Sequence, residues 1–160
     1  MSPCWRVSPS VVVDVNAELR APCTTEELFA WVDDLGRYPD WLEIVPRAEP
    51  AEAHPDDVGP AWSVDLLGRL GPLARSKRLR MVRTVHEPYR LVRFERADHD
   101  GREHSAWVLQ AEVAPAADGD GSVLTMHLHY GGALGGALVE KLLSDEIAKS
   151  RPRLLERVSS

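Results

Sequence analysis

Between residues 47 and 130 the chain is a series of short segments in which apolar and polar residues alternate. The segments fall near residues 47–54, 61–67, 74–87, 89–97, 103–114 and 122–130. A period of two is typical of half-buried β-strands. Turns rich in Asp, Gly and Pro separate the segments. Six consecutive strands with short connections predict an antiparallel sheet, because parallel strands need long crossovers.

The region before these segments predicts one more strand and two short helices. Residues 11–19 alternate in the same way. Thr24 and Glu27 match a capping box, which predicts a helix that Gly36 ends. A second short helix is expected to open at Pro39, because proline fits the first position of a helix.

The C-terminal region predicts a long amphipathic helix over residues 133–158, because leucines recur there at helical spacing. Pro152 interrupts it, and we favour a kink over an early end. The predicted class is therefore α+β, with a seven-stranded antiparallel sheet and a long C-terminal helix in the order β-α-α-β-β-β-β-β-β-α. A chain of 160 residues fits one domain, expected over residues 11–158, after a disordered or frayed N-terminus at residues 1–10.

Charge and composition disfavour several classes of partner. The net charge of -6 gives no general attraction to nucleic acid. No apolar stretch approaches the length that spans a bilayer, so stable membrane insertion is not expected. The first ten residues contain no apolar run that could serve in a signal peptide, and the two cysteines do not form a metal-binding motif. We expect a cytoplasmic protein, a monomer or weak homodimer.

Three segments, together with the order of elements, resemble the START-like helix-grip superfamily (SRPBCC). They are Leu-Arg-Ala-Pro at 19–22 followed by Glu-Leu-Phe at 27–29, the run 33–41 with its Tyr-Pro-Asp-Trp, and Gly-Ser-Val-Leu-Thr-Met at 121–126. The branch that the chain is similar to is the polyketide cyclase/dehydrase and lipid-transport group. The resemblance implies a helix-grip fold, in which the curved seven-stranded antiparallel sheet surrounds the long C-terminal helix. It also implies a cavity between the sheet and this helix. It determines the fold more firmly than the function, since members bind lipids or hormones or cyclise polyketides.

Strand alternation predicts which side chains face this cavity. Val64, Leu66 and Val85 are expected to point inward, as are the residues predicted to bind the ligand. These are Trp62, Leu79, Met81, Arg83, Phe94, Ser105, Trp107, Leu109, Met126, Leu128 and Tyr130 from the strands, and Leu138 from the helix. The alternative that these side chains simply fill the core remains open.

Polar residues on the predicted inner face are of most interest. Arg83, Ser105 and Tyr130 lie among apolar neighbours, where Arg83 or Tyr130 would orient a carboxylate, phenol or carbonyl group of a ligand. The alternative, which we favour for Arg83, is a solvated side chain at the cavity mouth or a strand shifted by one residue.

His127 and His129 share one strand face, which we expect to be the outer, solvated one. A catalytic zinc site needs three protein ligands, and no third ligand is evident on that face. We therefore predict no metal and no cofactor.

Two functions remain, and a structural or partner-binding domain with a collapsed core is the alternative if no cavity exists. The first is a binding or carrier protein for a small hydrophobic ligand, lipid-like or polyketide-like, with a lid formed by residues 38–45 and the turn 68–72. The alternative is a polyketide cyclase or aromatase-like enzyme acting on a poly-β-keto substrate. Its catalytic candidates are Arg83, Tyr130 and His104, and no familiar nucleophile motif supports them.

Overall fold

A computed structural model describes residues 11–70, 73–132 and 136–159. The strands are β1 (Val11–Ala21), β2 (Arg47–Pro50), β3 (Ala61–Leu70), β4 (Leu73–Glu87), β5 (Leu91–Arg96), β6 (Ala106–Pro115) and β7 (Ser122–Gly132). The helices are α1 (Thr25–Phe29), the 3-10 helix η1 (Leu35–Asp40) and α2 (Gly136–Ser159). The predicted disordered segment, residues 1–10, lies outside the described residues.

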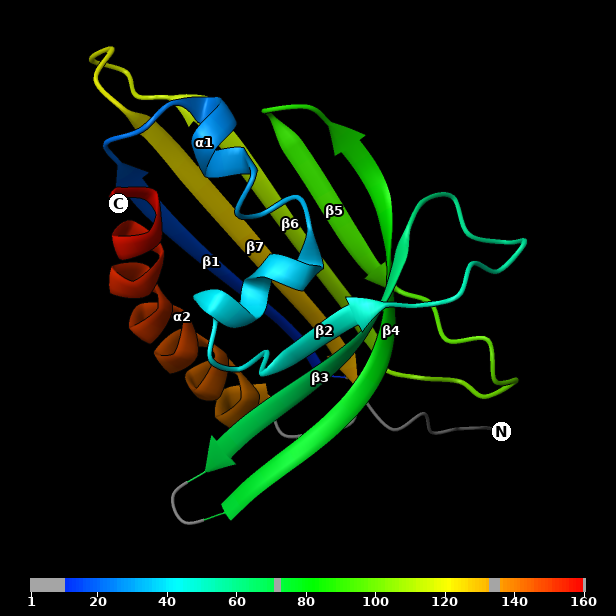
Figure 1. Cartoon of the computed structure of the whole chain (residues 1–160). Coiled ribbons are helices and arrows are strands. Elements are labelled where there is room, and N and C mark those ends of the chain that lie inside the picture. The colour runs from blue at the N-terminus through cyan, green and yellow to red at the C-terminus, as the bar shows by residue number, and fades with distance from the viewer. Residues whose placement is uncertain (1–10, 71–72, 133–135, 160) are drawn as a thin grey trace, which may run out of the picture.

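The strands form one antiparallel sheet in the order β1-β7-β6-β5-β4-β3-β2. Only β1 departs from a simple meander, because it pairs with β7 along its whole length. The sheet curves, and α2, α1 and η1 all lie on the same side of it (Figure 1). The prediction of a seven-stranded antiparallel sheet around a C-terminal helix is therefore confirmed. We call the face toward α2 the inner face.

The first helix is shorter than predicted. Thr24 caps it as expected, since its Oγ1 accepts the backbone N–H of Glu27 at 3.1 Å. After Phe29 the N–H of Trp31 bonds to the carbonyl of Leu28, three residues back, which tightens the helix into turns. Tyr38 Oη then donates to the carbonyl of Val32 at 2.9 Å. Leu28, Phe29 and Val32 are therefore buried by a short helix followed by turns and not by one continuous helix.

The second short helix begins earlier than predicted. It spans Leu35–Asp40, with Pro39 inside it and not at its start. Asp34 caps it by accepting the N–H of Gly36 at 2.8 Å. Gly36, which we expected to end a helix, lies near the start of one.

Helix α2 runs through Pro152, so the alternative of an early end is wrong. It packs along β1 and reaches β3, where Gly68 allows a close approach. A Cβ at Gly68 would lie 2.9 Å from a methyl carbon of Leu142. Among the described parts of the chain, no helix combines the length and apolar character needed to cross a membrane.

One prediction about strand faces is wrong because β4 contains a bulge. Its pairing with β5 shifts between Arg83 and Val85, so the alternation of side chains changes there. His86, not Val85, is the partner of the fully buried Val92 and takes the inner face. The His86 ring stacks on Phe29, with 5.8 Å between ring centroids.

Candidate functional site

An apolar cavity of about 60 Å³ lies between the inner face of the sheet, α2 and the segment that joins η1 to β2. Twelve side chains line it, and all are apolar. They are Leu35, Leu42, Ile44, Val45, Val64, Leu66, Leu79, Met81, Trp107, Leu109, Leu128 and Leu143.

Alternation along four strands supplies one wall of this cavity. β3, β4, β6 and β7 each direct every second residue inward, so pairs such as Leu79 and Met81 enter together. The opposite wall comes from residues 35–45 and from Leu143 of α2. The backbone N–H of Leu67 donates to the carbonyl of Ile44 at 2.8 Å, which fastens this wall to β3.

The cavity is small, and its apolar lining does not favour a bound water molecule. A water molecule needs roughly 10–15 Å³ of such space and two to four polar partners. The lining side chains offer almost no polar atoms, so water has little reason to occupy the cavity. Sites for drug-sized ligands are several times larger, roughly 300 Å³ and above. A ligand of that size therefore requires the walls to move.

The structure brings together five of the predicted ligand-binding residues at this cavity: Leu79, Met81, Trp107, Leu109 and Leu128. Trp62, Phe94 and Tyr130 face inward as expected but are buried in the core without lining the cavity. The side chain of Leu138 lies outside the described part of α2.

Two lining residues, Val64 and Leu66, were expected on the inner face but not among the ligand-binding residues. Sequence reasoning did not place five others at the cavity: Leu35, Leu42, Ile44, Val45 and Leu143. The sequence did contain a signal for Leu42, Ile44 and Val45, because they follow the Tyr-Pro-Asp-Trp motif in the segment expected to form a lid. Leu143 lies in the predicted C-terminal helix, but alternation and helical spacing did not assign it to the cavity.

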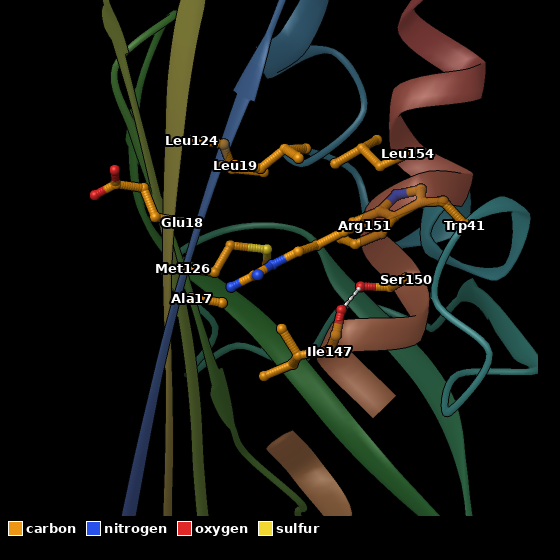
Figure 2. A pocket seen from close by; sticks show the side chains of 10 residues that line it. All are labelled: Ala17, Glu18, Leu19, Trp41, Leu124, Met126, Ile147, Ser150, Arg151 and Leu154. Carbon is orange, nitrogen blue, oxygen red and sulfur yellow. Dashed lines mark hydrogen bonds between the residues drawn. The ribbon is translucent and has the colours of Figure 1, made fainter. Parts of the chain in front are cut away.

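Met126 lines a second, smaller space of about 20 Å³ between β1, β7 and the C-terminal half of α2. Figure 2 shows the Arg151 side chain extending from α2 across this space toward Ala17 and Met126. Ile147 and Leu154 also border it, from the same helix. The volume holds little more than one water molecule, so we regard it as a packing gap and not as a ligand site.

Polar groups gather at the end of the inner face where β6 begins and β7 ends. Trp107 and Tyr130 are cross-strand partners, with 4.7 Å between ring centroids. Tyr130 Oη and Ser105 Oγ both lie over Gly132, where a Cβ would stand 2.1 Å and 2.9 Å from them. Any larger residue at 132 would displace both oxygens. Trp107 Nε1 is buried and has no hydrogen-bond partner in the described structure.

Arg83 does not line the cavity. Its side chain is half-buried, and one guanidinium nitrogen donates to the backbone carbonyl of Asp33 at 3.1 Å. His86 Nε2 lies 3.4 Å from the Asp33 carboxylate, so both side chains hold the turn after α1 against β4. These contacts give Arg83 a structural role.

His104 lies before β6 in an exposed loop. Its Nε2 is 2.9 Å from the Asp100 carboxylate, and its Nδ1 is 3.1 Å from an Arg96 nitrogen. The hydrogen bond with His104 lowers the pKa of Asp100. Neither His104, Arg83 nor Tyr130 lines the cavity, so the structure does not gather the three catalytic candidates around it.

The outer face of the sheet carries ionic contacts. His127 Nε2 and His129 Nδ1 lie 2.8 and 2.9 Å from one oxygen of Asp14, on the solvated face where both were expected. The most extensive contacts surround Arg80, which donates to both carboxylate oxygens of Asp57 at 2.8 and 2.6 Å. It also donates to the carbonyls of Glu52 and Ala97.

The Asp57 side chain is only 4% exposed. Hydrogen bonds from Arg80, and then from the backbone N–H of His54, hold the pKa of this carboxyl well below its usual range. Asp57 thereby fastens the loop between β2 and β3 to the outer face of β4.

His54, Asp56 and His99 bring three potential metal-ligand atoms within 4.8 Å of one another. The two imidazole rings, however, stack with centroids 3.6 Å apart and planes 7° apart. The lone pairs of an imidazole lie in its ring plane, so parallel stacked rings cannot both direct one at a shared ion. In this arrangement the cluster is a ring stack and not a prepared metal site.

Comparison with known proteins gives a family and a fold. Residues 12–158 match the model of a family described as "Polyketide cyclase / dehydrase and lipid transport". No curated protein sequence matches significantly.

Similar solved structures include a START superfamily protein from Mycobacterium smegmatis. It has 16% identity and a TM-score of 0.67, and the match covers 92% of this chain and 97% of that one. The Zhui aromatase/cyclase from Streptomyces sp. R1128 has 10% identity and a TM-score of 0.63, with 94% of both chains covered. The di-domain ARO/CYC StfQ of the steffimycin biosynthetic pathway has 15% identity and a TM-score of 0.61, with 92% of this chain and 49% of that chain covered. At these identities the likeness shows the fold alone.

Proposed function

The chain belongs to the polyketide cyclase/dehydrase and lipid transport family, and from that premise we propose that it binds or carries a small apolar ligand. The ligand would lie in the cavity between the inner face of the sheet and α2. Lipid-like and polyketide-like molecules are the classes of ligand that we expect.

The observation that carries this proposal is the cavity itself, with its twelve apolar lining residues. Atoms that border an empty space lose dispersion contacts that a close-packed interior would provide. An apolar ligand restores these contacts and removes its own surface from water, at roughly 25 cal/mol per Å². The site therefore favours apolar ligands over polar ones.

A ligand larger than the empty cavity would enter by movement of residues 41–45, between η1 and β2. Leu42, Ile44 and Val45 line the cavity from a segment that is not part of any strand. Moving it would break the hydrogen bond from Leu67 to Ile44 and those from Trp41 and Leu42 to the carbonyl of Tyr38, but would leave the sheet pairing intact. It is part of the segment 38–45 whose sequence predicts a lid; the other expected part of the lid, the turn 68–72, lies partly outside the described residues.

Binding of the fluorescent apolar probe 1-aminoanthracene tests the proposal. We expect the wild-type protein to bind it, and Leu109→Trp to weaken binding by about tenfold or more because the indole fills the cavity. Val108→Trp is the matched control, since Val108 is the next residue on β6 and faces the other side of the sheet. Absence of wild-type binding, or equal loss in both variants, would contradict the proposal.

The enzyme alternative, a cyclase or aromatase acting on a poly-β-keto substrate, receives support only from the fold shared with aromatase/cyclases. Arg83 and His104 are engaged in contacts away from the cavity, and Tyr130 is buried beside it. Because these groups do not converge on the cavity, we prefer the binding function.

A further inference from the structure

Residues 41–45, in the cyan segment that leads into β2 in Figure 1, form part of the cavity wall, and we call them the strap. Leu42, Ile44 and Val45 are no more than 8% exposed and line the cavity. Glu43, between the first two, has a side chain that is 49% exposed. The strap therefore has an apolar side toward the cavity and one charged side chain toward solvent.

Polar contacts fasten the strap to both walls of the cavity. The carbonyl of Ile44 accepts the backbone N–H of Leu67 in β3 at 2.8 Å. A carboxylate oxygen of Glu43 lies 3.4 Å from a guanidinium nitrogen of Arg153 in α2. The strap is thus held to the sheet through its backbone and to the helix through an ion pair between side chains.

The ion pair between Glu43 and Arg153 is weak enough to break in the folded protein. Both side chains are about half exposed, and exposed pairs of this kind shift an equilibrium by only about 1.5- to 5-fold. The pair between Arg80 and Asp57 is different, because the Asp57 side chain is only 4% exposed. Breaking the pair at Glu43 exposes no buried charge.

We propose that the ion pair between Glu43 and Arg153 is a latch that holds the strap closed and thereby regulates ligand binding. This inference rests on the proposed function, because a ligand larger than the empty cavity enters by movement of the strap. Outward movement of the strap separates the two side chains. The apparent affinity of a site falls with the fraction of molecules that are competent to bind, so the latch lowers the affinity for such a ligand.

Hydrogen exchange of the Leu67 amide measures opening of the strap without any ligand, because this N–H is bonded to Ile44. We expect the amide to exchange about 1.5- to 5-fold faster in Glu43→Gln and in Arg153→Gln than in the wild type. The double variant should add nothing to the larger single effect, because each substitution removes the same contact.

The matched control is Lys141→Gln. Lys141 also lies on α2 and forms an exposed ion pair, with Asp145 at 3.0 Å, but this pair does not involve the strap. Exchange at Leu67 should keep its wild-type rate in this variant. The amide of Arg83, which donates to the carbonyl of Pro60 at 2.9 Å, serves as a reference that should not change in any variant.

The affinity for 1-aminoanthracene, measured by fluorescence titration, is the second readout. Glu43→Gln and Arg153→Gln should bind the probe more tightly than the wild type, by the factor by which exchange at Leu67 accelerates. Lys141→Gln should bind it with wild-type affinity.

Wild-type exchange at Leu67 in both latch variants, or equal acceleration in Lys141→Gln, would overturn the inference. Faster exchange without tighter binding would also overturn it, because opening of the strap would then not admit the probe. If the wild-type protein does not bind 1-aminoanthracene, the proposed function is wrong, whereas exchange at Leu67 still decides whether the ion pair holds the strap closed.

Discussion

Arg80 and Trp107 lie on opposite faces of one sheet and differ in how completely their donors are paired. Arg80, on the outer face of β4, donates to Asp57, to the carbonyl of Glu52 and to that of Ala97. Trp107, on the inner face of β6, has a buried donor without a described partner. Leu79 and Met81, the neighbours of Arg80 in sequence, line the cavity from the other face.

This difference predicts that contacts on the outer face determine stability, whereas the inner face determines ligand binding. The contacts on the outer face form within the chain. They therefore hold the loop at Asp57 to β4 whether or not a ligand is bound. The inner face lacks packing atoms at the apolar cavity, and an apolar ligand would supply them. The two faces alternate along the same strands, so substitutions on neighbouring residues should affect different properties.

The largest effect is expected from Arg80→Leu. The substitution leaves the Asp57 carboxylate, whose side chain is 4% exposed, without its main partner. Urea denaturation should show a loss of stability several times that of Arg78→Leu, because Arg78 is largely exposed and pairs with Asp65 at the sheet surface. Equal losses for the two variants would mean that the Asp57 contacts contribute no more than a surface ion pair.

A smaller loss is expected from Leu79→Ala, which enlarges the cavity from the inner face. Leucine-to-alanine changes in cores reduce the free energy of unfolding by about 2–4 kcal/mol when the space does not collapse. The variant should also bind 1-aminoanthracene at least as tightly as the wild type. Lower stability combined with weaker binding would indicate that the walls collapse into the space.

The pH dependence of stability should depend on Asp57. The pKa of this carboxyl in the folded protein lies below its ordinary value of 3.8, so its contribution is complete above that pH and is lost as the pH falls below it. The difference in unfolding free energy between the wild type and Asp57→Asn should therefore be constant from neutral pH to about pH 5. It should shrink below pH 3.8. A difference that does not change down to pH 2 would contradict the assignment.

The smallest change in stability is expected from Trp107→Phe. The smaller ring loses packing, but the variant no longer buries an unpaired N–H, and these effects oppose each other. The free energy of unfolding should stay within about 1 kcal/mol of the wild-type value. A loss as large as that of Leu79→Ala would indicate that the indole N–H has a stabilising partner.

Much of the inner face could be predicted from sequence, because alternation assigns faces wherever a strand is regular. Alternation assigned Leu79, Leu109 and Leu128 to the correct face. It assigned Val85 to the wrong face, because the bulge in β4 depends on pairing with β5 and leaves no local signal in the sequence. The ionic partner of Arg80 could not be predicted from alternation either, because Asp57 lies 23 residues away in a loop.

The state of the Trp107 donor could not be read from sequence at all, since it depends on atoms from several strands. The central claim, that an apolar ligand enters the cavity, is tested directly by nuclear magnetic resonance through the indole signals of Trp107, whose side chain lines the cavity. Saturating 1-aminoanthracene should shift these signals in the wild-type protein. Trp107 signals that do not move at saturation would contradict binding of an apolar ligand in this cavity.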